Sequence, residues 1–244
     1  MAAGPPRVLV DTSAFRHTRV ADVGFFQETF RLGSREIPIR VLGVKQKPLP
    51  GPEQKWLREQ VQAMPTIARL AHERSISLCL YPELELEEMA GPSFPSSPVG
   101  ELLKGIAWES VPAAVERSKF QQMDLTIYVQ KETVVNFWKI LLEWDQTALD
   151  AKVDDWPFLT DFERRNLRDL GRFREICSAL HETHYRDAFH LWTAEVNNLD
   201  YFLVIDKKFV NVITKTSRIA LRTKLMAPAD LVRDLGIQQL DPMP

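Results

Sequence analysis

Two short apolar runs near opposite ends of the chain each lead into an aspartate. Arg7–Val10 is followed by Asp11, and Tyr201–Ile205 is followed by Asp206. Strand-like runs alternate with segments of helical spacing at both ends of the chain, which predicts an α/β domain with a central parallel sheet. Sites in such sheets form at the carboxyl ends of the strands, and neighbouring strands lie about 4.8 Å apart. We therefore expect Asp11 and Asp206 to lie close enough to share one ion.

A third aspartate, Asp187, lies in the first turn of the helix that we expect over His184–Val196, where the helix dipole favours a carboxylate. Carboxylates gathered at one point repel one another and lose hydration, so a chain has no packing reason to gather them. A bound cation is the usual compensation, and the acids therefore predict a metal site.

A fourth acid is expected from the helix that begins at Pro82, since proline suits a first helical turn. We expect Glu88 to face the strand ends, because Leu84 and Met89 can hold the helix against the sheet. Glu85, one turn earlier on the same face, is the alternative. We expect the two remaining glutamates of this helix, Glu83 and Glu87, to point to solvent.

The other expected elements follow from hydrophobic spacing, capping residues and turn residues. We expect helices over Gln54–Arg74, Asp161–Ala179 and Ala229–Leu235, strands over Ser75–Leu80 and Arg218–Thr223, an amphipathic stretch at Ala21–Leu32, an extended run at Ile37–Val44, a loop at Gly91–Gly100 and a mostly helical segment from Glu101 to about His181.

Composition and charge exclude few classes of protein. The formal net charge of −2 gives no global attraction to nucleic acid, so any such affinity must be local. No apolar stretch approaches about 20 residues, and the start lacks the apolar core of a signal peptide, so we expect no membrane span or export. Two cysteines, Cys79 and Cys177, indicate core residues of a reducing compartment, and we expect the chain to be cytoplasmic.

Four motifs lie in the two ends of the chain: VLVDTSAF (Val8–Phe15), LYPELELEEM (Leu80–Met89), RDAFHLWTAEVNNLDYFLVIDKKF (Arg186–Phe209) and ALRTKLMAPADLVRDLGI (Ala220–Ile237). Their resemblance is to the PIN-domain nucleases. It implies a three-layer α/β/α PIN-like domain whose core comprises residues 1–90 and 184–244. Residues 91–183 would be a mostly helical insertion within the same domain.

The same resemblance implies that Asp11, Glu88, Asp187 and Asp206 hold one or two Mg²⁺ or Mn²⁺ ions, which activate water for phosphodiester hydrolysis. Hard divalent ions prefer carboxylate oxygens, and a metal pair can stabilise both the attacking and the leaving oxygen. The expected function is therefore an endonuclease acting on RNA or other single-stranded nucleic acid. The chain departs from the family at Val204, where the family often has a threonine. The toxin nucleases of toxin–antitoxin pairs resemble both ends of the chain but are generally shorter.

A basic stretch follows Asp206. No acidic residue occurs from Lys207 to Ala229, whereas six lysines and arginines do, which indicates either a solvated rim or a track for the phosphate backbone. We favour phosphate contacts for Lys207, Lys208 and Lys215, together with Ser13.

Several alternatives stay open. A PIN-like fold that is catalytically weak or silent would serve as an RNA-binding or assembly scaffold, although a scaffold gains nothing from repelling carboxylates. A phosphatase with an aspartate nucleophile at Asp11 is disfavoured because Ser13 stands where such enzymes carry a second aspartate. Cys177, His181 and His184 have helical spacing for zinc but lack a fourth ligand. His190 is a candidate core or metal-supporting histidine. A protein partner or a homo-oligomer also stays open.

Overall fold

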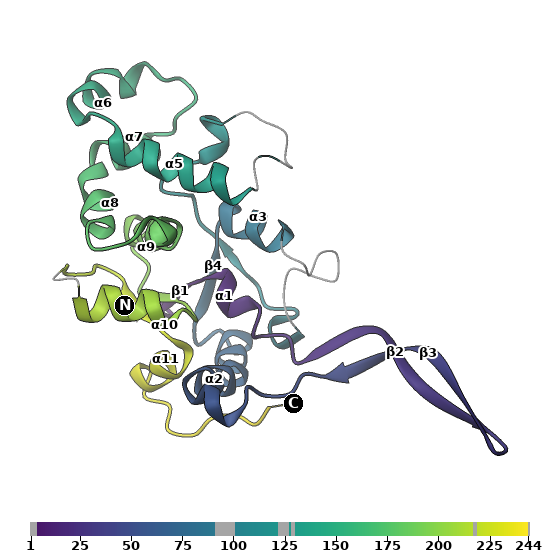
Figure 1. The fold of residues 1–244 in the computed structure, drawn as a ribbon. Helices are drawn as coiled ribbons and strands as arrows, with labels where there is room; N and C mark the ends of the chain where they lie inside the picture. The colour runs from purple at the N-terminus through teal and green to yellow at the C-terminus, as the bar shows by residue number, and fades with distance from the viewer. Residues whose placement is uncertain (1–3, 91–100, 122–126, 128–129, 217–218, 244) are drawn as a thin grey trace.

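The computed structural model describes residues 4–90, 101–121, 127, 130–216 and 219–243. Its central sheet has five parallel strands in the order β5-β4-β1-β6-β7 (Figure 1). The strands are β1 (Arg7–Val10), β4 (Ser77–Leu80), β5 (Glu109–Ser110), β6 (Tyr201–Leu203) and β7 (Lys224–Met226). The α/β class and the parallel sheet predicted from the sequence are confirmed.

Helices cover both faces of this sheet. Side chains alternate between the two faces along each strand, so the apolar side chains of β1 need packing partners on both sides. Val8 and Val10 belong to a hydrophobic cluster with α2 (Lys55–His72) and α11 (Pro228–Asp234). Leu9 belongs to the other cluster, which forms the opposite face.

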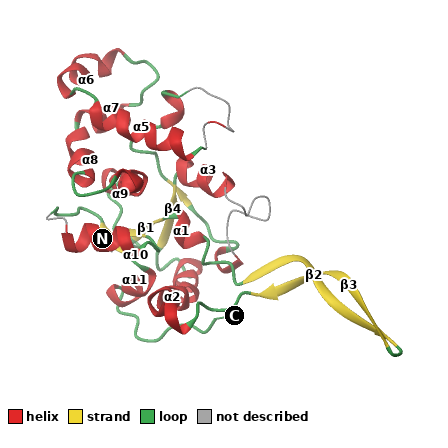
Figure 2. Cartoon of the chain, viewed as in Figure 1, coloured by secondary structure: helices red, strands yellow, loops and turns green. Residues whose placement is uncertain are grey.

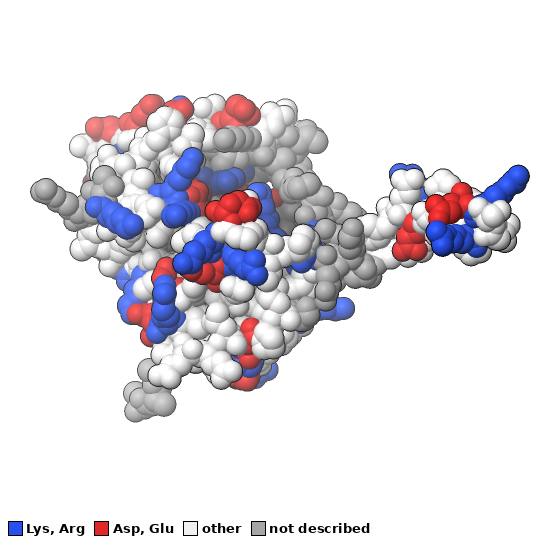
Figure 3. Space-filling view, turned by 60° about the horizontal axis from the view of Figure 1, so that its bottom comes forward, with Lys and Arg blue, Asp and Glu red and all other residues white. Residues whose placement is uncertain are grey.

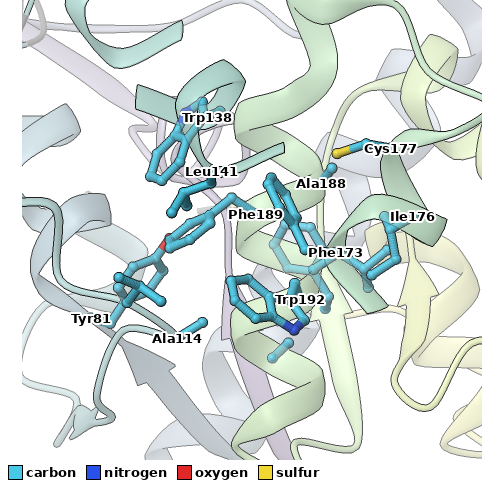
Figure 4. Packing of buried hydrophobic residues seen from close by; sticks show 14 of the residues in the cluster. Tyr81, Ala114, Trp138, Leu141, Phe173, Ile176, Cys177, Ala188, Phe189 and Trp192 are labelled. Carbon is cyan, nitrogen blue, oxygen red and sulfur yellow. The ribbon is translucent and has the colours of Figure 1, made fainter. Parts of the chain in front are cut away.

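The cluster on that opposite face contains α5 (Lys131–Glu143), α8 (Leu170–Cys177) and α9 (Tyr185–Val196) (Figure 4). The aromatic rings of Trp138 and Phe189 stack there with centroids 4.0 Å apart. The described part of the expected insertion thus shares one core with the sheet and with α9.

Shorter elements connect these parts. They are α1 (Thr12–Phe15), α3 (Pro82–Ala90), α6 (Gln146–Lys152), α7 (Asp161–Arg168) and α10 (Lys207–Asn211), the 3₁₀ turns η1 (Pro52–Gln54), η2 (Glu101–Leu103), η3 (Arg117–Lys119), η4 (Val153–Asp155) and η5 (Glu182–His184), and the π-helical turn η6 (Val212–Thr216). No helix in the described part of the chain is long and apolar enough to cross a membrane.

A long antiparallel hairpin stands apart from the sheet. Strands β2 (Ala21–Leu32) and β3 (Arg35–Gln46) pair over their full length and project from the body (Figures 1 and 2). The two-residue turn places Gly33 at φ +62°, in the left-handed region that glycine adopts without strain. The amphipathic stretch predicted at Ala21–Leu32 is therefore one arm of a hairpin.

One predicted helix is divided in the structure. The helix expected over Asp161–Ala179 is two helices, α7 and α8, which meet at Asp169. The break lets both Leu167 and Leu170 enter the core. The capping box that starts α7 is confirmed, with Glu163 and Thr160 each accepting a hydrogen bond from the other's backbone N–H.

The closing strand is β7, whereas the prediction placed it at Arg218–Thr223. In the described part of that range, the Arg222 N–H donates to the Glu195 carboxylate and the Thr223 hydroxyl donates to the Leu199 carbonyl. Those bonds hold the segment as a loop, and pairing with β6 begins only at Lys224. The segment from Glu101 to His181 also contains the edge strand β5, and the loop predicted at Gly91–Gly100 lies outside the described residues.

Candidate active site

Two of the predicted acids lie at the carboxyl edge of the central strands. Asp11 directly follows β1, and its backbone N–H donates to the Leu203 carbonyl at the end of β6 over 2.9 Å. Asp206 follows the same strand β6 after Val204 and Ile205 and caps α10. Because β1 and β6 are neighbours in the sheet, their aspartates are presented at the same edge, as the sequence predicts.

Asp187 lies in the first turn of α9, as predicted, and it forms a group with Asp206 and His184. Each of these three side chains offers a ligand atom, and the atoms lie within 4.8 Å of one another. His184 Nδ1 is 3.1 Å from Asp187 Oδ2. This hydrogen bond, followed by the charges of Asp187 and Asp206, raises the pKa of His184 despite partial burial.

Asp206 uses only one of its carboxylate oxygens locally. Oδ1 accepts the backbone N–H groups of Lys208 and Phe209 at 2.8 and 3.0 Å, which holds the side chain in place. No hydrogen bond from the described residues reaches Oδ2. The fixed carboxylate therefore has an oxygen available to a cation.

Asp11 is the most buried of the three aspartates, with 4% of its surface exposed. Its Oδ2 accepts the Ser13 N–H at 2.8 Å and the Ser13 hydroxyl. Burial raises the pKa of Asp11, and the charges of Asp187 and Glu87 raise it further, against the opposing charge of His190. Asp11 lies outside the compact group of Asp187, Asp206 and His184, but the charge of Asp187 reaches it.

Glu87 is the glutamate of α3 that contributes to this site, and the prediction that it faces solvent is wrong. Its Oε2 accepts from the Thr12 hydroxyl at 3.1 Å, while its Oε1 lies 3.2 Å from His190 Nε2 and 3.5 Å from Arg186 Nε. Leu84, one turn earlier, is fully buried, so the face that packs α3 on the body also carries Glu87.

Glu85 and Glu88 are the two other glutamates predicted as possible ligands from α3. Glu85, the alternative ligand, is exposed. Glu88 lies in α3, but its side chain is outside the described residues. Its predicted role as a metal ligand therefore stays a prediction.

His190 supplies a positive charge behind the acids. It is fully buried, with Nδ1 against the Tyr81 hydroxyl and Nε2 against Glu87. Burial alone would lower its pKa, but the charge and hydrogen bond of Glu87 raise the pKa above its ordinary value. Conversely, although burial raises the pKa of Glu87, the charge and hydrogen bond of His190 hold that pKa below its ordinary value. The Glu87 carboxylate therefore favours the protonated form of His190, whose Nε2–H donates to it.

Glu83 is also buried, and its predicted solvent position is wrong. Its Oε1 accepts from Arg117 at 3.0 Å (Nε) and 2.7 Å (Nη2), and both side chains are almost inaccessible. This pair joins α3 to η3 and so helps to fix the helix that carries Glu87. No feature of the local sequence identifies Arg117 as the partner, since the two residues are 34 positions apart.

The lysines predicted to contact phosphates differ in their surroundings, and acidic residues lie near other basic residues of the same stretch. Lys208 and Lys215 are exposed, and Lys207 Nζ lies 5.9 Å from the centre of the Trp56 ring. Two other basic residues of the stretch face acids, since Lys224 pairs with Asp234 at 2.7 Å and Arg222 lies 3.7 Å from Asp169. The face seen in Figure 3 accordingly mixes basic and acidic side chains.

Ser13, also predicted to contact nucleic acid, braces the two strand ends. Its hydroxyl donates to Asp11 and accepts the Ile205 N–H at 3.0 Å. These two bonds occupy the hydroxyl's donor and one acceptor site. The visible contribution of Ser13 is therefore to position Asp11 relative to the segment that leads to Asp206.

The residues considered for zinc are arranged for other contacts. Burial raises the pKa of the Cys177 thiol, which disfavours the thiolate that would bind a metal. His181 caps η5 through the Thr183 N–H, and His184 faces Asp187 instead. Cys79 is likewise buried, and burial raises its thiol pKa to about 12. Both cysteines are free.

Comparisons with known proteins add no identification. No family model matches the chain, and neither the curated proteins nor the solved structures contain a match. The candidate site is defined by the positions and charges of its own residues.

Proposed function

We propose that this chain is a metal-dependent endonuclease with a PIN-like core, which cleaves RNA or other single-stranded nucleic acid. One observation supports this most: Asp187 and Asp206 converge with His184 at the carboxyl edge of the parallel sheet, beside the buried Asp11. Like charges in a buried setting disfavour the metal-free state, and the raised pKa of Asp11 expresses that cost. A divalent cation would remove it. The free buried cysteines suit a reducing compartment such as the cytoplasm.

The donor set fits Mg²⁺ or Mn²⁺. Carboxylate oxygens suit both ions, and the imidazole of His184 is a better ligand for Mn²⁺ than for Mg²⁺. Asp187 and Asp206 would hold the ion, with His184 as a further ligand and Asp11 as a ligand or as the acceptor of a coordinated water's hydrogen bond. When bound, such an ion supplies a nucleophilic water and stabilises charge on the phosphate.

The chain's own residues would then position the substrate and balance charge. His190 holds Glu87 in a fixed orientation beside Thr12, with its positive charge behind the acids. Lys207 and Lys208 directly follow Asp206, where they can contact the phosphates on either side of the scissile bond. Attack by water would require no side-chain nucleophile.

Cleavage of labelled single-stranded RNA and DNA tests the proposal. The wild-type chain would be compared in Mn²⁺, Mg²⁺ and EDTA with Asp187→Asn, and with Asp155→Asn as a matched control at an exposed position on η4. We expect metal-dependent cutting that falls by about 100-fold or more in Asp187→Asn and is unchanged in Asp155→Asn. Equal activity of both variants would refute the assignment. Metal-independent binding without any cutting would instead identify a nucleic-acid-binding scaffold.

A further inference from the structure

The β2–β3 hairpin carries most of the large apolar side chains that are exposed in the described residues. It projects from the body rather than packing on it (Figures 1 and 3). The exposed side chains on it are Phe25, Phe30, Leu32, Ile37, Ile39, Val41 and Leu42. A two-stranded hairpin is only marginally stable in water by itself, and an apolar patch of this kind predicts a partner.

The two faces of the hairpin differ, as its register shows. Directly opposed residues of an antiparallel pair point to the same face, and faces alternate along each strand. Strand pairs such as Phe30 with Ile37 therefore define an apolar face. The apolar face consists of Phe26, Glu28, Phe30, Leu32, Arg35, Ile37, Ile39 and Val41.

The other face, here called the polar face, carries Arg31, Glu36 and Arg40 towards the turn, whereas the exposed pair Phe25 and Leu42 lies on it nearer the body. Arg31 and Glu36 oppose each other in the register and form a bidentate contact, with Arg31 Nη2 and Nε at 2.7 and 2.9 Å from Glu36 Oε1. Gln27, Thr29 and Arg40 also lie on this face. From Gln27 to Arg40, this face is therefore more polar than the apolar face.

The apolar face carries two charges that the hairpin does not pair. Glu28 opposes Ile39, and Arg35 opposes Leu32, so the two charged residues lie four positions apart along the hairpin and on different strands. Four positions correspond to about 13 Å, which is too far for a direct contact. Within the part of the chain that the structure describes, neither residue forms an ion pair.

We propose that the apolar face binds the same face of a second copy of this chain. The two charges have opposite sign and lie at equal distances on either side of the Phe30–Ile37 pair. The two apolar faces would be related by a two-fold axis that lies between them at the level of the Phe30–Ile37 pair. This axis runs parallel to the inter-strand hydrogen bonds, so the strands of the second hairpin run in the opposite direction to those of the first. Glu28 of one copy then comes to the level of Arg35 of the other, on a neighbouring strand. The interface is isologous, so the contact forms twice.

Charge and shape favour this occupant over nucleic acid. Glu28 and Glu36 offset most of the charge of Arg31, Arg35 and Arg40, so the described hairpin is not a basic ribbon. A phosphate backbone would gain little from an apolar face. A second copy instead buries apolar side chains on both sides and supplies an opposite charge for each unpaired residue.

The size of the face sets the expected affinity. The seven paired positions from Phe26 to Leu32 extend over about 24 Å, and the face is two strands wide. Such a contact lies at the lower end of specific protein interfaces, for which micromolar dissociation constants are ordinary. We therefore expect a dimer that dissociates on dilution.

Sedimentation velocity of the full chain at about 1 to 100 µM tests the proposal. We expect a reversible monomer–dimer equilibrium in the wild type. The charge reversals Glu28→Arg and Arg35→Glu should each weaken the dimer about tenfold or more, because each places like charges opposite one another. The double variant Glu28→Arg/Arg35→Glu should restore the dissociation constant to within about threefold of the wild-type value, since it exchanges the two partners. Arg40→Glu, on the polar face, is the matched control and should leave the equilibrium unchanged.

Melting temperatures equal to that of the wild type would show that the variants fold, since the hairpin lies outside the core. A wild type that stays monomeric at about 100 µM would overturn the proposal and leave a different protein as the occupant of the face. Single variants that dimerise as well as the wild type, or a double variant no better than the singles, would also overturn it. The proposal does not depend on the proposed nuclease activity, and the sedimentation result stands whichever way the cleavage assay turns out.

Discussion

Replacing Asp11 with asparagine should stabilise the metal-free protein at neutral pH. The Asp11 carboxyl is almost fully buried, and burial together with Asp187 and Glu87 raises its pKa, so its charged form is disfavoured in the fold. Asparagine keeps the side-chain oxygen that accepts the Ser13 N–H and is an equally good helix cap. The change therefore removes the charge while keeping the cap.

The expected gain follows from the size of this penalty. A buried charge without full compensation costs about 1 to 3 kcal/mol, and part of it is offset here by the loss of attraction to His190. We expect a net stabilisation of about 1 kcal/mol, which corresponds to a rise in Tm of about 2 to 4 °C for a chain of this size. A raised folded-state pKa means that the wild type loses stability as pH rises above the ordinary aspartate value of about 3.9. The Asn variant should therefore match the wild type near pH 4, exceed it as the pH rises through the raised pKa of Asp11, and keep a constant advantage at higher pH.

Thermal unfolding in EDTA across this pH range measures the difference. Adding Mn²⁺ should reverse the order at neutral pH, because the wild type gains stability by binding the ion and the variant gains less. Glu85→Gln, at an exposed position, is the control for loss of a negative charge. An Asp11→Asn variant that is less stable than the wild type in EDTA at pH 8 would refute the reasoning, since the carboxylate would then be stabilising the fold.

Three further results are expected. Glu83→Gln should cost about 3 kcal/mol in urea unfolding, because it removes the carboxylate charge that pairs with the buried Arg117 guanidinium. A loss no larger than that of Glu85→Gln would contradict the buried pair. Thr160→Ala should cost about 1 kcal/mol by removing one half of the capping box, and an unchanged urea midpoint would argue against that box. His184→Ala should weaken Mn²⁺ binding, measured by calorimetry, more than Mg²⁺ binding, because imidazole suits Mn²⁺ better; equal losses would exclude the imidazole as a ligand.

The sheet and its edge could be predicted because their signals are local. Each apolar run is short, buried on both faces and directly followed by an aspartate, so the strand and the position of its last acid are fixed together. The first turn of α9 is equally local, and it places Asp187 correctly. The positions of Asp11, Asp187 and Asp206 could therefore be predicted without knowing which distant residues they contact.

The glutamate of α3 was harder to assign because four glutamates lie within six positions. Counting from Pro82 favoured Glu88, whereas the packing of α3 is decided by Leu84, which puts Glu87 on the buried face. Glu83 is buried for a reason that the local sequence does not contain, namely Arg117 on a distant segment. A helical-wheel reading anchored on Leu84 would have found Glu87, but not the Glu83 pair.

The hairpin was missed although a signal for it was present. Gly33-Ser34 lies between two runs rich in β-branched and aromatic residues, which is a signature of a two-residue turn. Ala21–Leu32 also has apolar residues at spacings that fit an amphipathic element, and short-range pattern alone does not decide between the two readings. The register of the pair supplies what the pattern lacked, namely which residues share a face.

The most direct test of the central claim is crystallographic location of bound Mn²⁺ by its anomalous scattering. We predict a peak within about 2.5 Å of carboxylate oxygens of both Asp187 and Asp206, at the carboxyl edge of β1 and β6. The same peak should vanish in Asp187→Asn crystals grown under identical conditions. A fully occupied Mn²⁺ elsewhere in the molecule, with none at this edge, would contradict the account of the site.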